Sequence, residues 1–135
     1  MPEPIRTTRV RKFRDLDLEM LVHPLTNDIV GRSDVDAING SIIHIIKTQR
    51  GERVFQSEFG STIYHSLFEP MITETRVILT AAIKQAINTF EPRVELIGVE
   101  VNADEDRNGY DVTIAYTPVN EGSPVQLDFF LNRLR

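Results

Sequence analysis

Residues 110–117 read Tyr110-Asp111-Val112-Thr113-Ile114-Ala115-Tyr116-Thr117, with an apolar side chain at nearly every second position. A period of two is typical of a β-strand that buries one face. The same alternation occurs before this stretch at Ile97, Val99 and Val101, and after it at Val125, Leu127, Phe129 and Leu131. Hairpin signals separate the three stretches: Asn108-Gly109 in the first connection, and Gly122 with Pro124 in the second. We therefore expect a three-stranded antiparallel sheet.

Such a sheet has two open edges. An edge strand presents unpaired backbone N–H and C=O groups, which form a template for a strand from another chain. The last of the three strands is the natural candidate for pairing of this kind.

Two amphipathic helices are expected before the sheet. The first begins at Ser33, where Ser33-Asp34-Val35-Asp36 resembles a capping box, and it ends near Thr48. Its apolar stripe consists of Ile38, Ile42, Ile45 and Ile46. A short turn of helix follows Ser61 or Thr62 and ends by Pro70.

The second long helix spans residues 73–90, with Thr73 as its N-cap and Pro92 just beyond its end. Its apolar stripe consists of Ile72, Leu79, Ile83, Ala86, Ile87 and Phe90. The order of elements predicts an α+β fold of two layers, in which two main helices pack on the three-stranded antiparallel sheet.

Charge is unevenly distributed along the 135 residues, whose net charge is −5. Residues 1–14 hold five basic side chains against one acidic one, while residues 15–135 are strongly acidic. We interpret this as a basic N-terminal arm at 1–14 and a single domain at 15–135. Because no basic stripe and no long apolar run occurs, neither nucleic acid nor a membrane is an expected partner.

Motifs for metal binding and catalysis are incomplete. Residues 104–109 resemble the start of an EF-hand loop, but Ala115 stands where the bidentate Glu belongs. The chain has no cysteine, and its three histidines share no ligand spacing. We expect no metal and no cofactor. A glycosidase needs only two carboxylates, for instance Glu52 with Glu69, so that class stays open as an alternative.

Two clusters have no explanation in the fold alone. One is Gly51-Glu52-Arg53 with Phe59-Gly60, interpreted as a structural motif; the other is Glu91-Pro92-Arg93, where the long helix meets the first strand. Arg93 carries a planar fork that suits a carboxylate. The second cluster is either an internal ion pair, such as Glu91 with Arg53, or a rigid knob that another protein recognises.

The order of these motifs resembles the contractile-tail baseplate wedge or sheath-initiator family. That family includes lysozyme-like phage tail baseplate proteins and relatives in type VI secretion baseplates. The resemblance covers roughly Phe13 to Phe130. It rests on Phe13-Arg14-Asp15-Leu16-Asp17-Leu18, the isoleucine-rich helix, Thr48-Gln49-Arg50-Gly51-Glu52-Arg53, Phe59-Gly60-Ser61, Leu67-Phe68-Glu69-Pro70, the long helix, Glu91-Pro92-Arg93 and the strand ending at Tyr116. Ser57 departs from the family, which often has Pro there, and the opening at 15–18 resembles the phage members.

The resemblance implies structural work rather than catalysis. In this family the motif at Glu91, Pro92 and Arg93 is implicated in joining wedge subunits. The terminal strand, here about 125–134 with Val125, Leu127, Phe129 and Leu131, resembles the segment that pairs with sheath subunits and starts the sheath.

We accordingly expect a non-enzymatic baseplate component, present in several copies in a virion tail and assembled in the host cytoplasm. Its expected partners are wedge proteins, the tail sheath subunit and, through the basic arm, tail tube proteins. The alternative is a tail-associated peptidoglycan hydrolase, a muramidase.

Overall fold

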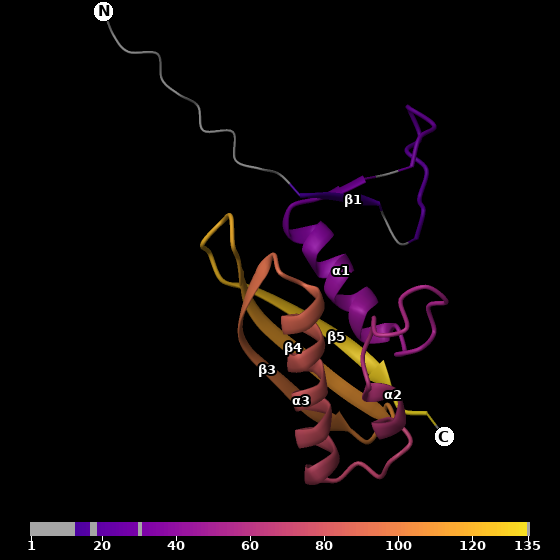
Figure 1. Cartoon of the computed structure of the whole chain (residues 1–135), viewed down its shortest axis with the longest axis vertical. Helices are drawn as coiled ribbons and strands as arrows, with labels where there is room; N and C mark the ends of the chain where they lie inside the picture. The colour runs from indigo at the N-terminus through magenta and orange to yellow at the C-terminus, as the bar shows by residue number, and fades with distance from the viewer. Residues whose placement is uncertain (1–12, 17–18, 30, 135) are drawn as a thin grey trace, which may run out of the picture.

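The computed structural model describes residues 13–16, 19–29 and 31–134. The expected basic arm therefore lies almost wholly outside the described residues. The main sheet consists of β3 (Val94–Asp104), β4 (Gly109–Pro118) and β5 (Val125–Asn132) in the antiparallel order β3-β4-β5. The helices α1 (Val35–Lys47) and α3 (Thr73–Phe90) pack against it, and the short α2 (Ile63–Ser66) lies near the end of β5 (Figure 1). This is the predicted α+β fold.

The core lies between the two long helices and the sheet. Most of the predicted stripe residues are buried: Ile38, Ile42, Ile45 and Ile46 on α1, and Leu79, Ile83, Ala86 and Ile87 on α3. Phe90 is half-buried, and the prediction is wrong at Ile72, which precedes α3 and has an exposed side chain. Tyr110, Val112, Ile114 and Tyr116 of β4 are also fully buried beneath the helices. The hydroxyl of Tyr116 donates a hydrogen bond of 2.6 Å to Oδ1 of Asn39, which joins the central strand to α1.

The predicted alternation in the first strand is wrong at Ile97. The pairing of β3 with β4 shifts register between Leu96 and Gly98, so Ile97 is the extra residue of a β-bulge and its side chain is exposed. Leu96 packs on the core before the bulge, and Val99 and Val101 do so after it. One extra residue in a strand shifts the alternation, so that the side chains after it lie on the opposite face of the sheet from the one that an unbroken alternation predicts.

The two predicted N-caps are also wrong. The first helix begins at Val35 with Asp34 at the cap position, Ser33 belongs to β2, and no side chain caps the helix. The cap of α3 is Ile72 instead of Thr73, again with no side-chain cap bond. At the start of α1 a tertiary contact is present instead: the N–H of Asp34 donates to the carbonyl oxygen of Phe13 at 2.8 Å.

A second, two-stranded sheet was not predicted. It consists of β1 (Arg14–Leu16) and β2 (Gly31–Ser33), which pair antiparallel beside the start of α1 (Figure 1). Among its described residues, the segment around and between these strands exposes six large apolar side chains. They are Leu16, Met20, Leu21, Val22, Leu25 and Ile29.

Candidate functional site

The Glu91-Pro92-Arg93 motif forms an ion pair within itself. Glu91 follows the last residue of α3, and its backbone N–H still donates to the carbonyl of Ile87 at 2.9 Å. Its carboxylate accepts two hydrogen bonds from Arg93, 2.6 Å from Nε to Oε1 and 2.8 Å from Nη2 to Oε2. The side chain of Glu91 is 2% exposed and that of Arg93 is 25% exposed. The carboxylate is therefore sealed inside, while one side of the guanidinium reaches solvent.

Burial by itself would raise the pKa of Glu91. Hydrogen bonds from Arg93 and Ser41, together with the charge of Arg93, outweigh that effect and hold the pKa below its ordinary value. The pKa of Arg93 is raised, chiefly by its hydrogen bonds to Glu91. The guanidinium also lies 5.3 Å from the ring centroid of Phe13. The pair thus links the end of α3 to α1 and to the residue preceding β1.

The suggested partnership of Glu91 with Arg53 is wrong, because Arg53 has other contacts. Its guanidinium carbon lies 4.1 Å from the ring centroid of Phe59, and Nη2 is 2.7 Å from Nε2 of His44. Phe59 in turn packs on Phe90, with ring centroids 5.1 Å apart. Arg53 therefore holds the loop against α1 and the end of α3 instead of neutralising the buried carboxylate.

Two glycines fix the backbone of this loop. Gly51 has φ 89°, and its N–H donates to the carbonyl of Ser57 at 2.8 Å. Gly60 has φ 114°, and a Cβ there would lie 2.5 Å from the carbonyl oxygen of Thr48. The carboxylate Oε2 of Glu52 accepts from the N–H of Gln49 at 3.0 Å. These contacts support the interpretation of Gly51, Glu52, Arg53, Phe59 and Gly60 as a structural motif.

The structure brings the two clusters side by side, which the sequence did not indicate. Phe90 belongs to the Arg53 cluster, and the next residue, Glu91, belongs to the ion pair. Their partners on α1, His44 and Ser41, are one helical turn apart. Both clusters therefore brace the same junction between α1 and the end of α3.

The predicted binding strand is an edge strand, but its apolar side chains point inward. Leu127 and Leu131 are buried, and Val125 and Phe129 are half-buried against the core. β5 pairs with β4 along one side, and no residue that the structure describes pairs with its other side over 125–132. A partner strand can therefore pair with the unpaired backbone side of β5 and contact its side chains at the edge of the sheet.

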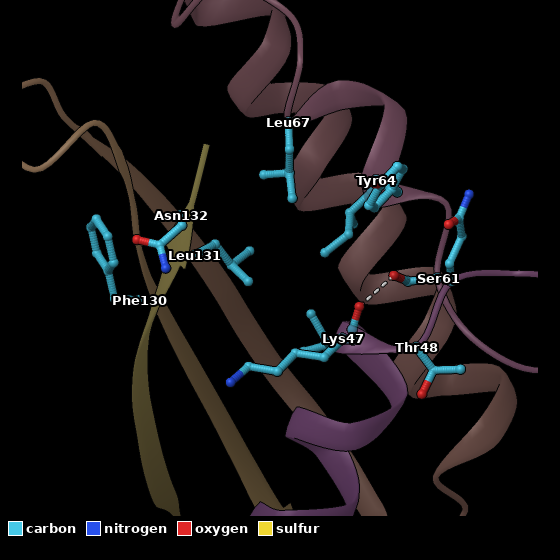
Figure 2. Close-up of a pocket in the computed structure, with 11 residues that line it drawn as sticks. Lys47, Thr48, Ser61, Tyr64, Leu67, Phe130, Leu131 and Asn132 are labelled. Atoms are coloured by element: carbon cyan, nitrogen blue, oxygen red, sulfur yellow. Dashed lines mark hydrogen bonds between the residues drawn. The ribbon is translucent and has the colours of Figure 1, made fainter. Parts of the chain in front are cut away.

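A cavity of about 200 Å³ lies beside the end of this edge, and we call it the β5 slot. Figure 2 shows side chains from the end of α1, from the α2 region and from β5 around it. Ile46, Ile63, Leu67 and Leu131 give it apolar walls, and Lys47 and Asn132 are among its polar lining. Three residues of β5 and none of β4 line the slot, so it lies on the outer side of the edge strand. Sequence reasoning missed it, because the slot joins segments far apart in the chain.

The remaining chemical candidates have structural explanations. Arg107 binds both Asp104 and Asp111 at the β3–β4 turn, so a cation already occupies the acidic tip that resembled a calcium loop. Among the described residues, no group of three metal-ligating side chains comes together, and no helix has the length and apolarity to cross a membrane. Glu52 and Glu69 are both exposed on separate loops, and neither lines the β5 slot.

Comparison with known proteins gives a family match over most of the described chain. The family model described as baseplate wedge protein gp25 matches residues 32–122. The baseplate wedge protein gp25 of Enterobacteria phage T4 is 34% identical over 90 residues, which cover 66% of this chain and 67% of that protein.

Two solved structures share the fold. A Geobacter sulfurreducens protein described as a tail lysozyme is 27% identical with a TM-score of 0.69, over 74% of this chain and 91% of that one. A chain of the anti-feeding prophage baseplate is 21% identical with a TM-score of 0.71, over 81% of this chain and 87% of that one.

Proposed function

The chain belongs to the baseplate wedge protein gp25 family, and from that membership we propose that it joins wedge subunits and starts the sheath through β5. The chain is accordingly a structural component of a phage tail baseplate, an assembly in which it occurs in multiple copies. The observation that carries the sheath part of the proposal is the open edge of β5. A strand added there gains main-chain hydrogen bonds without needing any particular side chain on β5.

The inward orientation of the β5 side chains favours strand addition over a side-chain interface. Leu127 and Leu131 already belong to the core, so a partner reaches them only from the rim of the sheet. Asp128 and Gln126 on the opposite face hydrogen-bond to each other, and Asp128 also accepts from Thr113 of β4. These bonds lie on the face of the sheet away from the core and leave the open backbone edge of β5 to an extended segment.

The wedge contact is assigned to the outer side of the Glu91–Arg93 pair. Pro92 is exposed, and Nη1 of Arg93 makes no hydrogen bond to any residue that the structure describes. Glu91 holds Nε and Nη2, which orients the guanidinium before a partner arrives. A fixed fork loses less conformational entropy on binding than a free side chain does.

Proline substitution tests the sheath contact. Because successive N–H groups of a strand point in opposite directions, Asp128→Pro and Phe129→Pro remove one outward N–H and one N–H that faces β4. The variant that loses the outward N–H should keep the melting temperature of the parent chain, because its bonds to β4 remain. That variant should no longer co-elute with the cognate sheath subunit. Undiminished co-elution of that folded variant would remove β5 from the sheath contact.

The muramidase alternative gains no support from Glu52 and Glu69, the pair of described carboxylates considered for it. A glycosidase needs two carboxylates facing one sugar-binding cleft. The exposed Glu52 and Glu69 do not meet that condition, since the carboxylate of Glu52 is held by the backbone of its own loop. We expect the purified chain not to clear a peptidoglycan suspension.

The proposed contact of the basic arm with wedge or tube proteins is tested by deleting residues 1–12 and measuring baseplate assembly.

A further inference from the structure

We infer that the β5 slot receives one large apolar side chain from the strand that adds to β5, and that this insertion sets the register of the added strand. The inference rests on the proposed function, because it takes β5 as the edge that the sheath uses. Backbone pairing alone specifies register weakly, since every position of a strand offers the same N–H and C=O groups. A pocket at one position of the edge removes that ambiguity.

The position of the slot fits an added strand. Such a strand lies about 4.8 Å beyond β5, and side chains of directly paired residues point to the same face of a sheet. Leu131 points toward the helices and forms a wall of the slot (Figure 2). The partner residue opposite Leu131 therefore points into the slot, whichever direction the added strand runs.

The size and lining of the slot define the chemistry of that residue. The volume of about 200 Å³ exceeds the roughly 150 Å³ of an apolar cavity known to hold a benzene ring. Ile46, Ile63 and Leu67 line it with aliphatic carbon. A Leu, Ile, Met or Phe side chain fits this space and buries its carbon atoms against these apolar walls.

The end of the edge is closed beyond the slot. After β5 the chain turns toward α2, where the N–H of Leu134 donates to the carbonyl of Leu67 at 3.0 Å. Nε of Arg133 donates to the carbonyl of Glu69 at 3.2 Å. The backbone N–H of Arg133 donates to the carbonyl of Asn108 at 3.0 Å, so the backbone N–H groups of both residues after Asn132 already have partners and an added strand ends near the slot. A terminal anchor of this kind prevents the added strand from sliding by two residues.

Filling the slot from the protein's own side tests the inference. Lys47 is exposed and lines the slot, so Lys47→Trp should fill its mouth without disturbing the β5 backbone. Lys84→Trp is the matched control, since it places the same residue at an exposed lysine of α3. We expect Lys47→Trp to weaken binding of the cognate sheath subunit at least tenfold while its melting temperature stays that of the parent chain. The control Lys84→Trp should bind the sheath subunit as tightly as the parent chain does.

A photo-crosslinking residue in place of Tyr64, which also lines the slot, gives a second readout. Crosslinks should reach one large apolar residue within an extended sheath segment. Amide hydrogen exchange separates the two levels of the account. If sheath binding protects β5 amides but Lys47→Trp binds like the parent chain, or the crosslinks reach polar residues, the slot inference is overturned and the proposed function stands. If sheath binding protects no β5 amide, both are overturned.

Discussion

The carboxylate of Glu91 is bound through both oxygens by the guanidinium of Arg93, only two residues further along the chain. Pro92 makes this short-range pair rigid, because its ring fixes φ between the two partners. Glu91 directly follows α3 and Arg93 directly precedes β3, so the pair fixes the angle between the helix and the strand. The motif is therefore first a structural clamp. Any role in recognition depends on the side of Arg93 that stays open.

Removing Arg93 should cost more stability than neutralising Glu91. Arg93→Ala leaves a buried carboxylate without its main partner, and we expect a loss of about 3 kcal/mol. Glu91→Gln leaves a guanidinium that solvent already reaches, and we expect a loss of about 1–2 kcal/mol. Urea unfolding followed by circular dichroism measures both. Equal losses would contradict the sealed position of Glu91.

The pair also makes stability depend on acidity. The pKa of Glu91 is lower in the folded chain than its ordinary value of 4.5, so the unfolded chain takes up the proton first as pH falls. The stabilisation from Glu91 is fully present above about pH 4.5 and is lost as pH falls through the folded pKa. The stability gap between the parent and Glu91→Gln should therefore narrow from pH 6 to pH 3. A constant gap over that range would refute the assignment.

Two glycines should respond to alanine in opposite directions. Gly60→Ala forces a side chain into positive φ and against the carbonyl of Thr48, and we expect a loss of at least about 2 kcal/mol. Gly40→Ala lies inside α1, where the new Cβ meets no atom within 4 Å apart from the adjacent residues and backbone of its own helix, and we expect a gain of about 0.5–1 kcal/mol. Thermal unfolding of the two variants is the measurement. A stable Gly60→Ala protein would show that the loop does not need this backbone.

Wedge binding should be sensitive to the surface beside Arg93. Pro92→Glu places an acidic side chain next to the open side of the guanidinium, and we expect at least a tenfold loss of affinity for the cognate wedge protein. Pro70→Glu is the matched control, because Pro70 is an exposed proline at the other end of α3. Binding measured by calorimetry should be unchanged for the control. Wedge binding that survives Pro92→Glu would place the contact elsewhere.

Local periodicity was sufficient to predict the core and the order of its elements. The stripes of α1 and α3 and the alternation of β4 and β5 each depend on neighbours within one segment, and they are confirmed except at Ile72, whose side chain is exposed. The bulge at Ile97 escaped prediction because the alternating pattern of apolar residues continues through it. The predicted cap at Ser33 is wrong because Ser33 belongs to β2, and the N–H of Asp34 donates to the carbonyl of the distant Phe13.

The candidate site was predictable as a set of residues but not as an arrangement. Glu91, Pro92 and Arg93 stood out because a negative charge is unfavourable at the C-terminal end of a helix and Pro92 holds it there. The partner of Glu91 was misassigned to Arg53, because spacing in sequence does not say which guanidinium reaches a buried carboxylate. The β1–β2 pair had no periodic signal, since each strand has only three residues.

Amide hydrogen exchange across β3, β4 and β5, with and without the cognate sheath subunit, tests the central claim most directly. In the free chain, every second amide of β5 should exchange quickly, because its N–H points away from β4. Addition of the sheath subunit should slow exchange at those alternate positions between Val125 and Asn132 and leave the outward amides of β3 unchanged. Unchanged exchange along β5 in a saturated complex would contradict strand addition at this edge.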